Sequence, residues 1–481
     1  MRALALLLLT LTARAGPGAP VAAAPSASWD GVWWAPSHAS ALVPMDRKPL
    51  PFTPAGRARY EQIRTELARG TRIDEAVHIC LSQGLPRAMN SAYPFQIAVT
   101  PGQVTFLYEE NRSYRIVRVT DRHADPAVWD PSFMGEGIAR WSGTDELVID
   151  STNFKADEMY LDATGIPVSD RLHIIEHLRL LDGGERLEEV LTVEDPGTFT
   201  RSWSVRRVYA HRPDVELKTD WVCGEPHRDL TAAARPPAKT TRAKMAAPSA
   251  AHMALNGFWA NIGPPTAALS IAKAAAGTLQ PAPGMAAMRE KQQPWAAAEY
   301  TKAMAAMAAG EYVPTPEMQC YPSQPPGTGR LAPNNYGLEY LITARDVIML
   351  AEQNAVMRIV HMDRDHLSHV VPGWQGDSVG HWEADTLVVD TIGFNDHNYL
   401  DRGVPFTSQM HVVERLRLVD DQLVDEATFD DPGAFTGPFN ISKRYRRGRP
   451  FQEYVCQENN HEGGVPTSTG EPTPVDLPGA H

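Results

Sequence analysis

The sequence predicts an all-β protein with two tandem antiparallel β-barrels of the calycin or lipocalin type, each accompanied by one peripheral helix. A chain of 481 residues, 43% of them hydrophobic and 21% charged, indicates a globular protein too long for one ordinary core. The motif GDSVGHWEADTLVVD at residues 376–390 returns at residues 135–150 as GEGIARWSGTDELVID, degraded and with one residue inserted. Because short alternating segments accompany the motif, we expect two copies of one β-rich domain.

The alternating segments of the first half predict its strands. Apolar and polar residues alternate, without helical crossovers between them, over residues 95–99, 104–109, 114–119, 147–152, 172–181, 186–193, 202–209 and 215–222. Successive short strands of this kind pair antiparallel, and closure into a barrel removes the exposed edges. Within the motif, Gly376 and Gly380 are interpreted as punctuating a tight segment anchored by Trp382, with a strand following over residues 386–390.

One helix is predicted beside each barrel. Thr53 is a favourable N-cap, Pro54 a favourable first helical residue and Gly70 a C-terminal stop, so the first helix runs to about Arg69. Residues 294–309, rich in Ala and Met, repeat this helix in the second half. The duplication extends to individual positions: Arg115 and Arg358, His123 and His366, His173 and His411, Glu176 and Glu414, and Asp195 and Asp431.

Five segments divide the chain. Residues 1–24 form a signal peptide: Arg2 is positively charged, residues 3–12 are apolar, and small residues offer cleavage sites at residues 13–15 or after Ala24. Residues 25–229 are the first barrel repeat, residues 230–253 a linker rich in Ala and Pro, and residues 254–462 the second barrel repeat. Residues 463–481 are expected to be a disordered tail. We therefore expect a monomer exported to the periplasm or the extracellular space.

Charge and hydropathy exclude two classes of partner. The net charge is −13 and no run of Lys or Arg stands out, which argues against nucleic acid and anionic membranes. After the first 24 residues no stretch approaches the roughly 18 apolar residues that a membrane span requires.

Four cysteines occupy equivalent positions in the two repeats. Each repeat has one Cys after its helix, Cys80 or Cys320, and one on its last predicted strand, Cys223 or Cys456. In an exported protein this pattern favours disulfides Cys80–Cys223 and Cys320–Cys456 over metal binding, because no close C-x-x-C spacing is present.

The motif resembles a family of exported bacterial proteins that carry one or two copies of this repeat. The resemblance rests on Gly-x-Ser-x-Gly-x-Trp-Glu-x-Asp-Thr-Leu-Val-Val-Asp, then Phe-Asn, then Leu/Met-His-Val-x-Glu-Arg, and it covers both repeats. The family is uncharacterised, so the resemblance implies no particular reaction. The first repeat departs from the pattern: Glu136, Gly137 and Arg140 stand where the second has Asp377, Ser378 and His381.

A buried ion pair is predicted inside each barrel. Every second residue from 410 to 418 is apolar except Glu414, and the row from Arg358 to Met362 is apolar except Arg358. Glu176 and Arg115 repeat this arrangement. A carboxylate on an inward face needs a partner, so we pair Glu414 with Arg358. The pair either fixes strand register, which is the favoured interpretation, or binds a polar group of a ligand.

The candidate catalytic residues are Asp377, His381, Asp390, His411 and Glu414. Histidine beside carboxylates can perform acid–base chemistry near neutral pH. The candidate substrate-binding residues are Trp382, Arg358, Tyr399 and Trp374. Because Arg140 replaces His381 in the first repeat, and arginine stays protonated, we expect any catalysis to reside in the second repeat. The alternative is that Trp382 and Asp390, present in both repeats, only anchor a turn and a strand.

Other chemistries rank lower. Ser378 lies in Gly-Asp-Ser-Val-Gly, but a nucleophile elbow needs a strand-to-helix turn and a strand follows here. His361, His366 and His369, with His381 and His411, offer a metal site as a minor alternative, so no cofactor is expected. Two functions stay open. One is a cofactor-free lyase or hydrolase acting on a small, partly apolar molecule; the other is a non-enzymatic, lipocalin-like binding or carrier protein.

Overall fold

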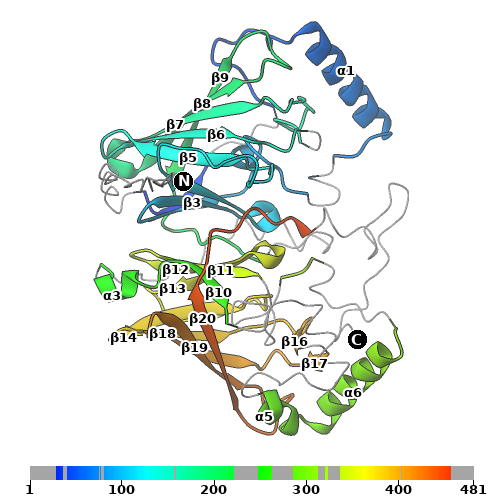
Figure 1. Cartoon of the computed structure of the whole chain (residues 1–481), viewed down its shortest axis with the longest axis vertical. Coiled ribbons are helices and arrows are strands. Elements are labelled where there is room, and N and C mark those ends of the chain that lie inside the picture. The colour runs from blue at the N-terminus through cyan, green and yellow to red at the C-terminus, as the bar shows by residue number, and fades with distance from the viewer. Residues whose placement is uncertain are drawn as a thin grey trace, which may run out of the picture.

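The protein consists of two closed β-barrels joined in one chain, as the sequence predicts (Figure 1). The computed structural model describes residues 29–35, 41–74, 76, 81–156, 159–220, 247–262, 285–311, 320–322, 336–401 and 403–456. The first barrel is built, in chain order, from β1 (Gly31–Trp34), β2 (Phe95–Thr100), β3 (Gln103–Tyr108), β4 (Ser113–Val119), β5 (Glu136–Trp141), β6 (Glu146–Thr152), β7 (His173–Leu181), β8 (Arg186–Glu194) and β9 (Trp203–His211).

The second barrel repeats this order. Its strands are β10 (Gly257–Asn261), β11 (Gly337–Ile342), β12 (Asp346–Ala351), β13 (Val356–His361), β14 (Asp377–Glu383), β15 (Thr386–Ile392), β18 (His411–Val419), β19 (Gln422–Asp430) and β20 (Phe439–Arg447). A separate two-stranded sheet pairs β16 (Tyr399–Asp401) with β17 (Val404–Pro405). The predicted all-β class is confirmed.

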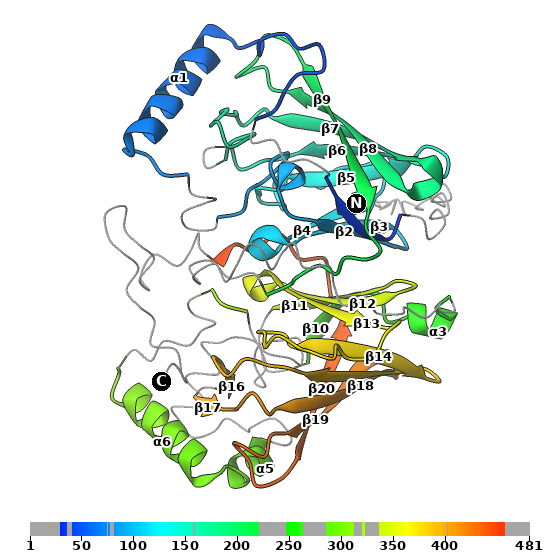
Figure 2. The ribbon, with the colours of Figure 1, turned by 180° about the vertical axis from the view of Figure 1, so that it is seen from behind.

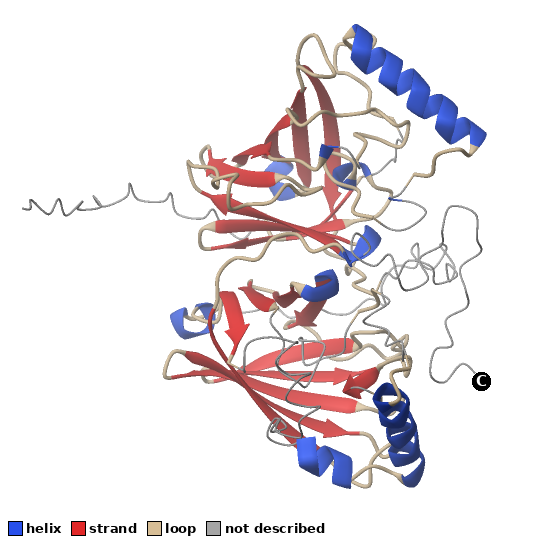
Figure 3. Ribbon diagram, turned by 45° about the vertical axis from the view of Figure 1, so that its right-hand side comes forward, coloured by secondary structure: helices blue, strands red, loops and turns tan. Residues whose placement is uncertain are grey.

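Helices lie outside the barrels (Figures 2 and 3). α1 (Pro54–Arg69) begins and ends as predicted: the Thr53 hydroxyl accepts a hydrogen bond from the Gly56 N–H at 2.9 Å, and Gly70 is left-handed at φ 69°. α1 rests on the loop after β8, because a Cβ on Gly56 would lie 2.3 Å from the Thr198 carbonyl oxygen. In the second repeat α6 (Pro294–Ala308) is the predicted helix, and two short helices, α3 (Ala250–Met253) and α5 (Met285–Glu290), accompany it.

Pairing is not antiparallel throughout. β4 pairs parallel with β5, and β13 pairs parallel with β14. The connections over residues 120–135 and 362–376 are long enough to return the chain to the same end of the barrel, which parallel pairing requires. The expectation of wholly antiparallel barrels is therefore wrong at one junction in each repeat.

The glycine-punctuated motif is a strand rather than a tight segment. Residues 377–383 form β14, which pairs with β15 along its whole length. Gly380 is required by close packing, since a Cβ there would lie 2.7 Å from both Met362 Sδ and Val360 Cγ1. Glycine inside a strand here marks close approach of a neighbour rather than a turn.

The segment that follows the last strand of each repeat crosses to the other repeat. Residues 215–220, predicted as part of the eighth alternating strand (215–222), are not a strand: the Glu216 carboxylate binds Arg364, and Asp220 accepts the Gln375 N–H at 3.2 Å. In return, Glu453 accepts the Phe133 N–H at 2.8 Å. We call residues 212–220 the first tail and residues 448–456 the second tail. Each tail places an acid on the loop that leads into β5 or β14 of the other barrel.

The outer faces of β2–β4 and β11–β13 meet in the interface between the barrels (Figure 1). One cluster of buried apolar side chains spans both repeats: Ala98, Leu107, Tyr114, Leu217, Leu341, Ile348, Leu350, Met357, Ile359 and Phe451. Beside it, Gln96 Nε2 donates to Asp346 Oδ2 at 3.1 Å, and Gln103 Nε2 donates to Glu339 Oε1 at 2.8 Å. Gln96 is equivalent to Glu339 and Gln103 to Asp346 in the strand registers, so the contacts are reciprocal, as in a two-fold dimer interface.

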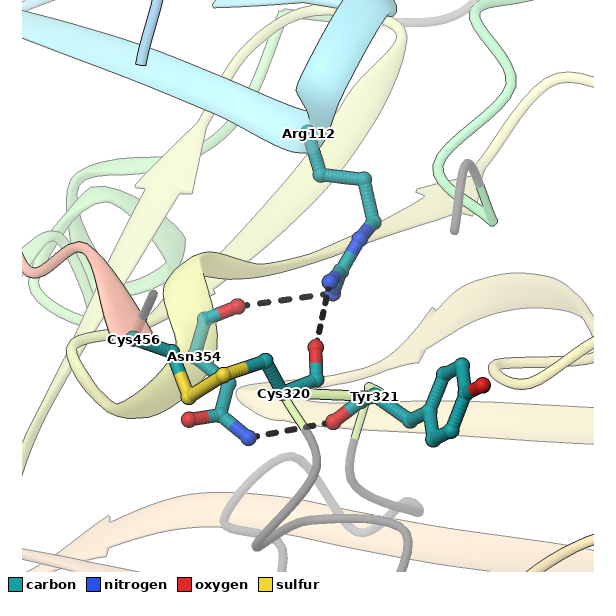
Figure 4. Close-up of a disulfide and its surroundings, with 5 residues drawn as sticks. All are labelled: Arg112, Cys320, Tyr321, Asn354 and Cys456. Atoms are coloured by element: carbon teal, nitrogen blue, oxygen red, sulfur yellow. Dashed lines mark hydrogen bonds between the residues drawn. A yellow bond between two sulfur atoms is a disulfide. The ribbon is translucent and has the colours of Figure 1, made fainter. Parts of the chain in front are cut away.

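The disulfide Cys320–Cys456 is present, as predicted (Figure 4). Arg112 of the first repeat donates to the Cys320 carbonyl oxygen at 2.9 Å and to the Asn354 carbonyl oxygen at 3.4 Å. The disulfide therefore lies at the contact between the repeats. The predicted Cys80–Cys223 pair, the signal peptide, residues 463–481 and most of the linker lie outside the described residues. In the part of the chain that the structure describes, no helix has the length and apolar character needed to cross a membrane.

Glu339 makes the interface sensitive to pH. Burial raises the pKa of Glu339 to about 8, although its hydrogen bond with Gln103 acts in the opposite direction. The folded protein thus holds this proton more tightly than the unfolded chain, so the contribution to stability is complete below about pH 4.5 and is lost as pH rises through 8. We expect Glu339→Gln to flatten the fall in urea midpoint between pH 5 and 9. Parallel curves for the wild type and the variant would contradict this.

Candidate functional site

A buried ion pair lies inside each barrel, as predicted. In the first, Arg115 on β4 binds Glu176 on β7 with nitrogen–oxygen distances of 2.9 and 2.5 Å. In the second, Arg358 on β13 binds Glu414 on β18. All four side chains are 1% exposed or less. Complete burial of both pairs, with bidentate geometry in the first, indicates a structural role, because a group that reacts with a substrate has to touch it.

The two pairs differ at one neighbouring position. Ser378 Oγ accepts from Arg358 Nε at 3.0 Å, and Thr391 Oγ1 accepts from Arg358 Nη2 at 2.7 Å. In the first barrel Gly137 stands where Ser378 does, and Arg115 Nε is buried without a hydrogen-bond partner among the described residues. The second ion pair is therefore the better satisfied of the two.

A chain of carboxylates and histidines lies on the outer face of the second barrel. Asp390 Oδ1 on β15 is 3.0 Å from His366 Nε2 and 2.8 Å from His411 Nε2. His366 Nδ1 is 2.8 Å from Asp377 Oδ2, and Arg364 Nη2 donates to Asp377 Oδ1 at 2.6 Å. Strand alternation explains the grouping, because Asp377, Asp390 and His411 all point outward while Ser378, Thr391 and Val412 point inward.

The first barrel carries the same chain. Asp150 Oδ1 is 3.1 Å from His123 Nε2 and 2.9 Å from His173 Nε2. His123 Nδ1 contacts Glu136, and His173 Nδ1 lies 3.1 Å from Glu194 Oε2. We call the series from Glu136 through His123, Asp150 and His173 to Glu194 the first relay, and the series from Asp377 through His366 and Asp390 to His411 the second relay.

Electrostatics polarise the second relay. The hydrogen bond between His366 and Asp377 raises the pKa of His366, although burial acts to lower that pKa. Burial acts to raise the pKa of Asp377, but hydrogen bonds from His366 and Arg364 outweigh it and hold that pKa well below the usual range. Asp377 is thus a permanent anion, and His366 takes up a proton more readily than a free histidine.

His381 does not join Asp377 and Asp390, which corrects the predicted cluster. Four residues along an extended strand separate His381 from Asp377 by about 13 Å. The His381 side chain is 63% exposed, and its Nε2 lies 3.4 Å from Glu383 Oε1. His366 holds the position between the two aspartates. The sequence indicates His366 only through the equivalent histidine at position 123. The path of the connection over residues 362–376, which brings His366 between the two aspartates, cannot be read from the sequence.

The predicted substrate-binding residues do not share one site. Arg358 lies inside the barrel, and Trp382 stacks on His252 of α3 with ring centroids 3.8 Å apart. Trp374 is buried and stacks on Tyr321 at 5.0 Å, while Tyr399 lies in the small β16–β17 sheet.

Two cavities between the barrels are related by the internal repeat. The first encloses about 410 Å³, part of it open to solvent, and Gln103, Ile116, Arg118, Trp129, Glu136, Phe258 and Phe451 line it. The second encloses about 280 Å³, and Val32, Val215, Glu216, Asp346 and His361 are among its lining residues. Arg118 and His361 are equivalent, since Gln103 pairs with Arg118 as Asp346 pairs with His361.

The cavities differ in what the crossing tail brings to them. In the second, Glu216 lies with one oxygen 2.8 Å from Arg364 Nε and the other 3.6 Å from His361 Nε2. In the first cavity the second tail contributes Pro450 and Phe451 to the lining, while its Gln452 accepts the Asp130 N–H at 2.9 Å. A carboxylate of the crossing tail therefore lines the second cavity, whereas the tail residues lining the first cavity, beside Glu136 of the first relay, carry no charge. Sequence reasoning missed Glu136, Arg118 and Glu216 because it did not pair the two barrels.

Neither a metal-binding cluster nor a matching protein family identifies the function of the site. Within the described ranges no group of three or more His, Cys, Asp or Glu residues is arranged to hold a metal ion. The chain matches no protein-family model, and a comparison with curated proteins gives no match.

Removing the Ser378 hydroxyl beside Arg358 should destabilise the protein, and adding a hydroxyl at the equivalent position 137 beside Arg115 should stabilise it. We expect Ser378→Gly to cost roughly 1–3 kcal/mol of unfolding free energy, because Arg358 Nε loses its partner. Gly137→Ser should stabilise the protein relative to Gly137→Ala, since both add a Cβ 3.3 Å from Ser151 Oγ but only Ser offers an acceptor to Arg115 Nε. Urea unfolding measures all three variants, and equal stabilities for the two Gly137 variants would contradict the account.

His366 should stabilise the protein in a defined pH window. Because its folded pKa is raised, the contribution is complete below about pH 6.5 and is lost as pH rises through the folded value; the lowered pKa of Asp377 keeps its own contribution present above about pH 3.8. The stability difference between wild type and His366→Gln should thus be largest from pH 4 to 6.5 and shrink toward pH 9. The matched control is His369→Gln, an exposed histidine on the same connection. An unchanging difference would refute the polarised relay.

Proposed function

We propose that the protein is an exported, cofactor-free acid–base enzyme, a lyase or hydrolase, whose active site is the first cavity between the barrels. The observation that carries the proposal is the position of Glu136, which lines the cavity and begins the first relay. The Glu136 side chain is only 4% exposed, whereas Glu194 at the other end of the relay is 45% exposed. The relay thus connects a secluded carboxylate with solvent.

This arrangement suits proton transfer. Glu136 takes a proton from the substrate or from an attacking water and returns it to the leaving group, while His123, in contact with Glu136, passes a proton between Glu136 and Asp150. Arg118, which contacts Glu136 and lines the same cavity, supplies positive charge for an oxygen that becomes anionic. Elimination and hydrolysis are both accelerated by an acid, a base and a cation arranged in this way, and neither requires a redox cofactor.

The proposal moves the site from the second repeat, where the sequence suggested it, to the first. The second relay is intact, but the Glu216 carboxylate lines the cavity beside it, and Arg364 is held by both Glu216 and Asp377. A carrier that binds its ligand inside a barrel is less favoured, because the buried ion pairs and side chains such as Phe106, Tyr340 and Tyr445 fill the barrel interiors. Export is supported by the Cys320–Cys456 disulfide, which an oxidising compartment maintains.

The matched relays allow a direct test. A panel of small esters, lactones and β-hydroxy acids is offered to the wild type, and the best substrate is used with the variants. We expect Glu136→Gln and His123→Gln to lower kcat/KM by about 10²–10⁴-fold, the usual contribution of a general acid or base.

The controls make the same changes in the other repeat. Asp377→Asn and His366→Gln should retain turnover within a few-fold at a temperature where each variant is folded. Loss of activity only in the second-repeat variants would return the site to that repeat. Binding of the panel without turnover by the wild type would instead identify a carrier.

A further inference from the structure

We infer that the ligand of the first cavity is a small carboxylic acid with a planar, apolar body, and that Arg118 binds its carboxylate. The inference rests on the proposed function, since it names the substrate class of the same cavity. It is argued from the second cavity, where the protein provides a carboxylate of its own.

Glu216 shows which group the repeated cavity accepts. Its carboxylate binds Arg364 at 2.8 and 3.1 Å and lies 3.6 Å from His361, the residue equivalent to Arg118. This carboxylate comes from the other repeat, so it binds Arg364 beside the cavity as an external carboxylate would. By the internal correspondence, an external carboxylate in the first cavity lies beside Arg118.

The first cavity leaves this position open. The second tail lines it with Pro450 and Phe451, and the Gln452 side chain accepts a hydrogen bond from the Asp130 N–H. Arg118 uses Nη2 to contact Glu136 and is one-third exposed. A guanidinium has five N–H donors and keeps its charge at any physiological pH, so donors are left for a second carboxylate. Arginine at this position, in place of His361, makes the attraction independent of protonation.

The other residues that line the first cavity determine which ligand body fits beside the carboxylate. Trp129, Phe258 and Phe451 give three aromatic rings to the lining, and Ile116 adds an aliphatic side chain. The Arg118 guanidinium lies 5.7 Å from the Trp129 ring, so charge and aromatic surface are adjacent. Aromatic rings prefer offset stacks or edge contacts with other planar groups. A planar unsaturated or aromatic acid therefore satisfies both parts of the lining.

Benzoate and benzamide test the inference, because they share a planar body and differ in charge. Binding is measured by calorimetry and by quenching of tryptophan fluorescence on the full chain. We expect benzoate to bind at least tenfold more tightly than benzamide. Arg118→Gln should lose this preference and Arg118→Lys should retain part of it, while Arg122→Gln, at an exposed arginine four residues away, should keep it. Equal binding of the two probes, or benzoate binding unchanged in Arg118→Gln, overturns the inference.

Glu136→Gln separates this inference from the proposed function. The substitution removes a negative charge beside the site, so benzoate should bind the variant as tightly as wild type or more tightly, while turnover is lost. Benzoate binding by a variant that still turns over its substrate would leave the carboxylate site standing and refute the acid–base role of Glu136. Loss of benzoate binding in folded Glu136→Gln would overturn the assignment of Arg118 as the anchor.

Discussion

The packing of one barrel's outer face against the other's is the constraint on which the rest of the structure depends. Strand alternation in an isolated barrel puts apolar residues inside and polar residues outside, yet Leu107, Ile348, Leu350 and Met357 point outward and are completely buried. Burying each such side chain contributes about 1.5–3 kcal/mol, so neither barrel is complete without the other. The reciprocal contacts of Gln96 and Gln103 with acids of the second repeat then fix how the faces meet. Both cavities and both crossing tails follow from this one arrangement.

Joining the two halves in one chain allows them to differ. In a symmetric dimer of a single repeat, each change would appear at both copies of the interface. Here the Glu216 carboxylate lines one cavity while Pro450 and Phe451 line the other, and Ser378 completes one ion pair while Gly137 leaves the other short of an acceptor. The better satisfied ion pair and the second relay beside the Glu216 carboxylate both belong to the second repeat. Under the proposed function, the first repeat is the working half and the second the supporting half.

What could be predicted from the sequence was what depends on local pattern. Period-two alternation located most strands and the inward Arg358–Glu414 pair, and capping residues located α1 at both ends. The prediction of a tight segment around Gly380 was wrong, because close packing against neighbouring side chains, and not a turn, requires glycine there. Grouping His381 with Asp390 failed because nearness in sequence is not nearness along an extended strand. Glu216 reaches the second cavity from a tail about 150 residues away in sequence from Arg364, and no local pattern records such a contact.

Burial decides between the two sets of ionisable residues that recur in both repeats. The Arg–Glu pairs in the barrel interiors are inaccessible, mutually neutralised and held by further hydroxyl groups, so a ligand could reach them only by disrupting the core. The outer relays keep histidines between carboxylates, with side chains from nearly buried to almost half exposed. A small barrel commonly binds its ligand in the lumen, but here side chains occupy that space. Chemistry therefore has room where the two barrels meet, and the first cavity is the place at that boundary where a relay carboxylate, a cation and aromatic walls come together.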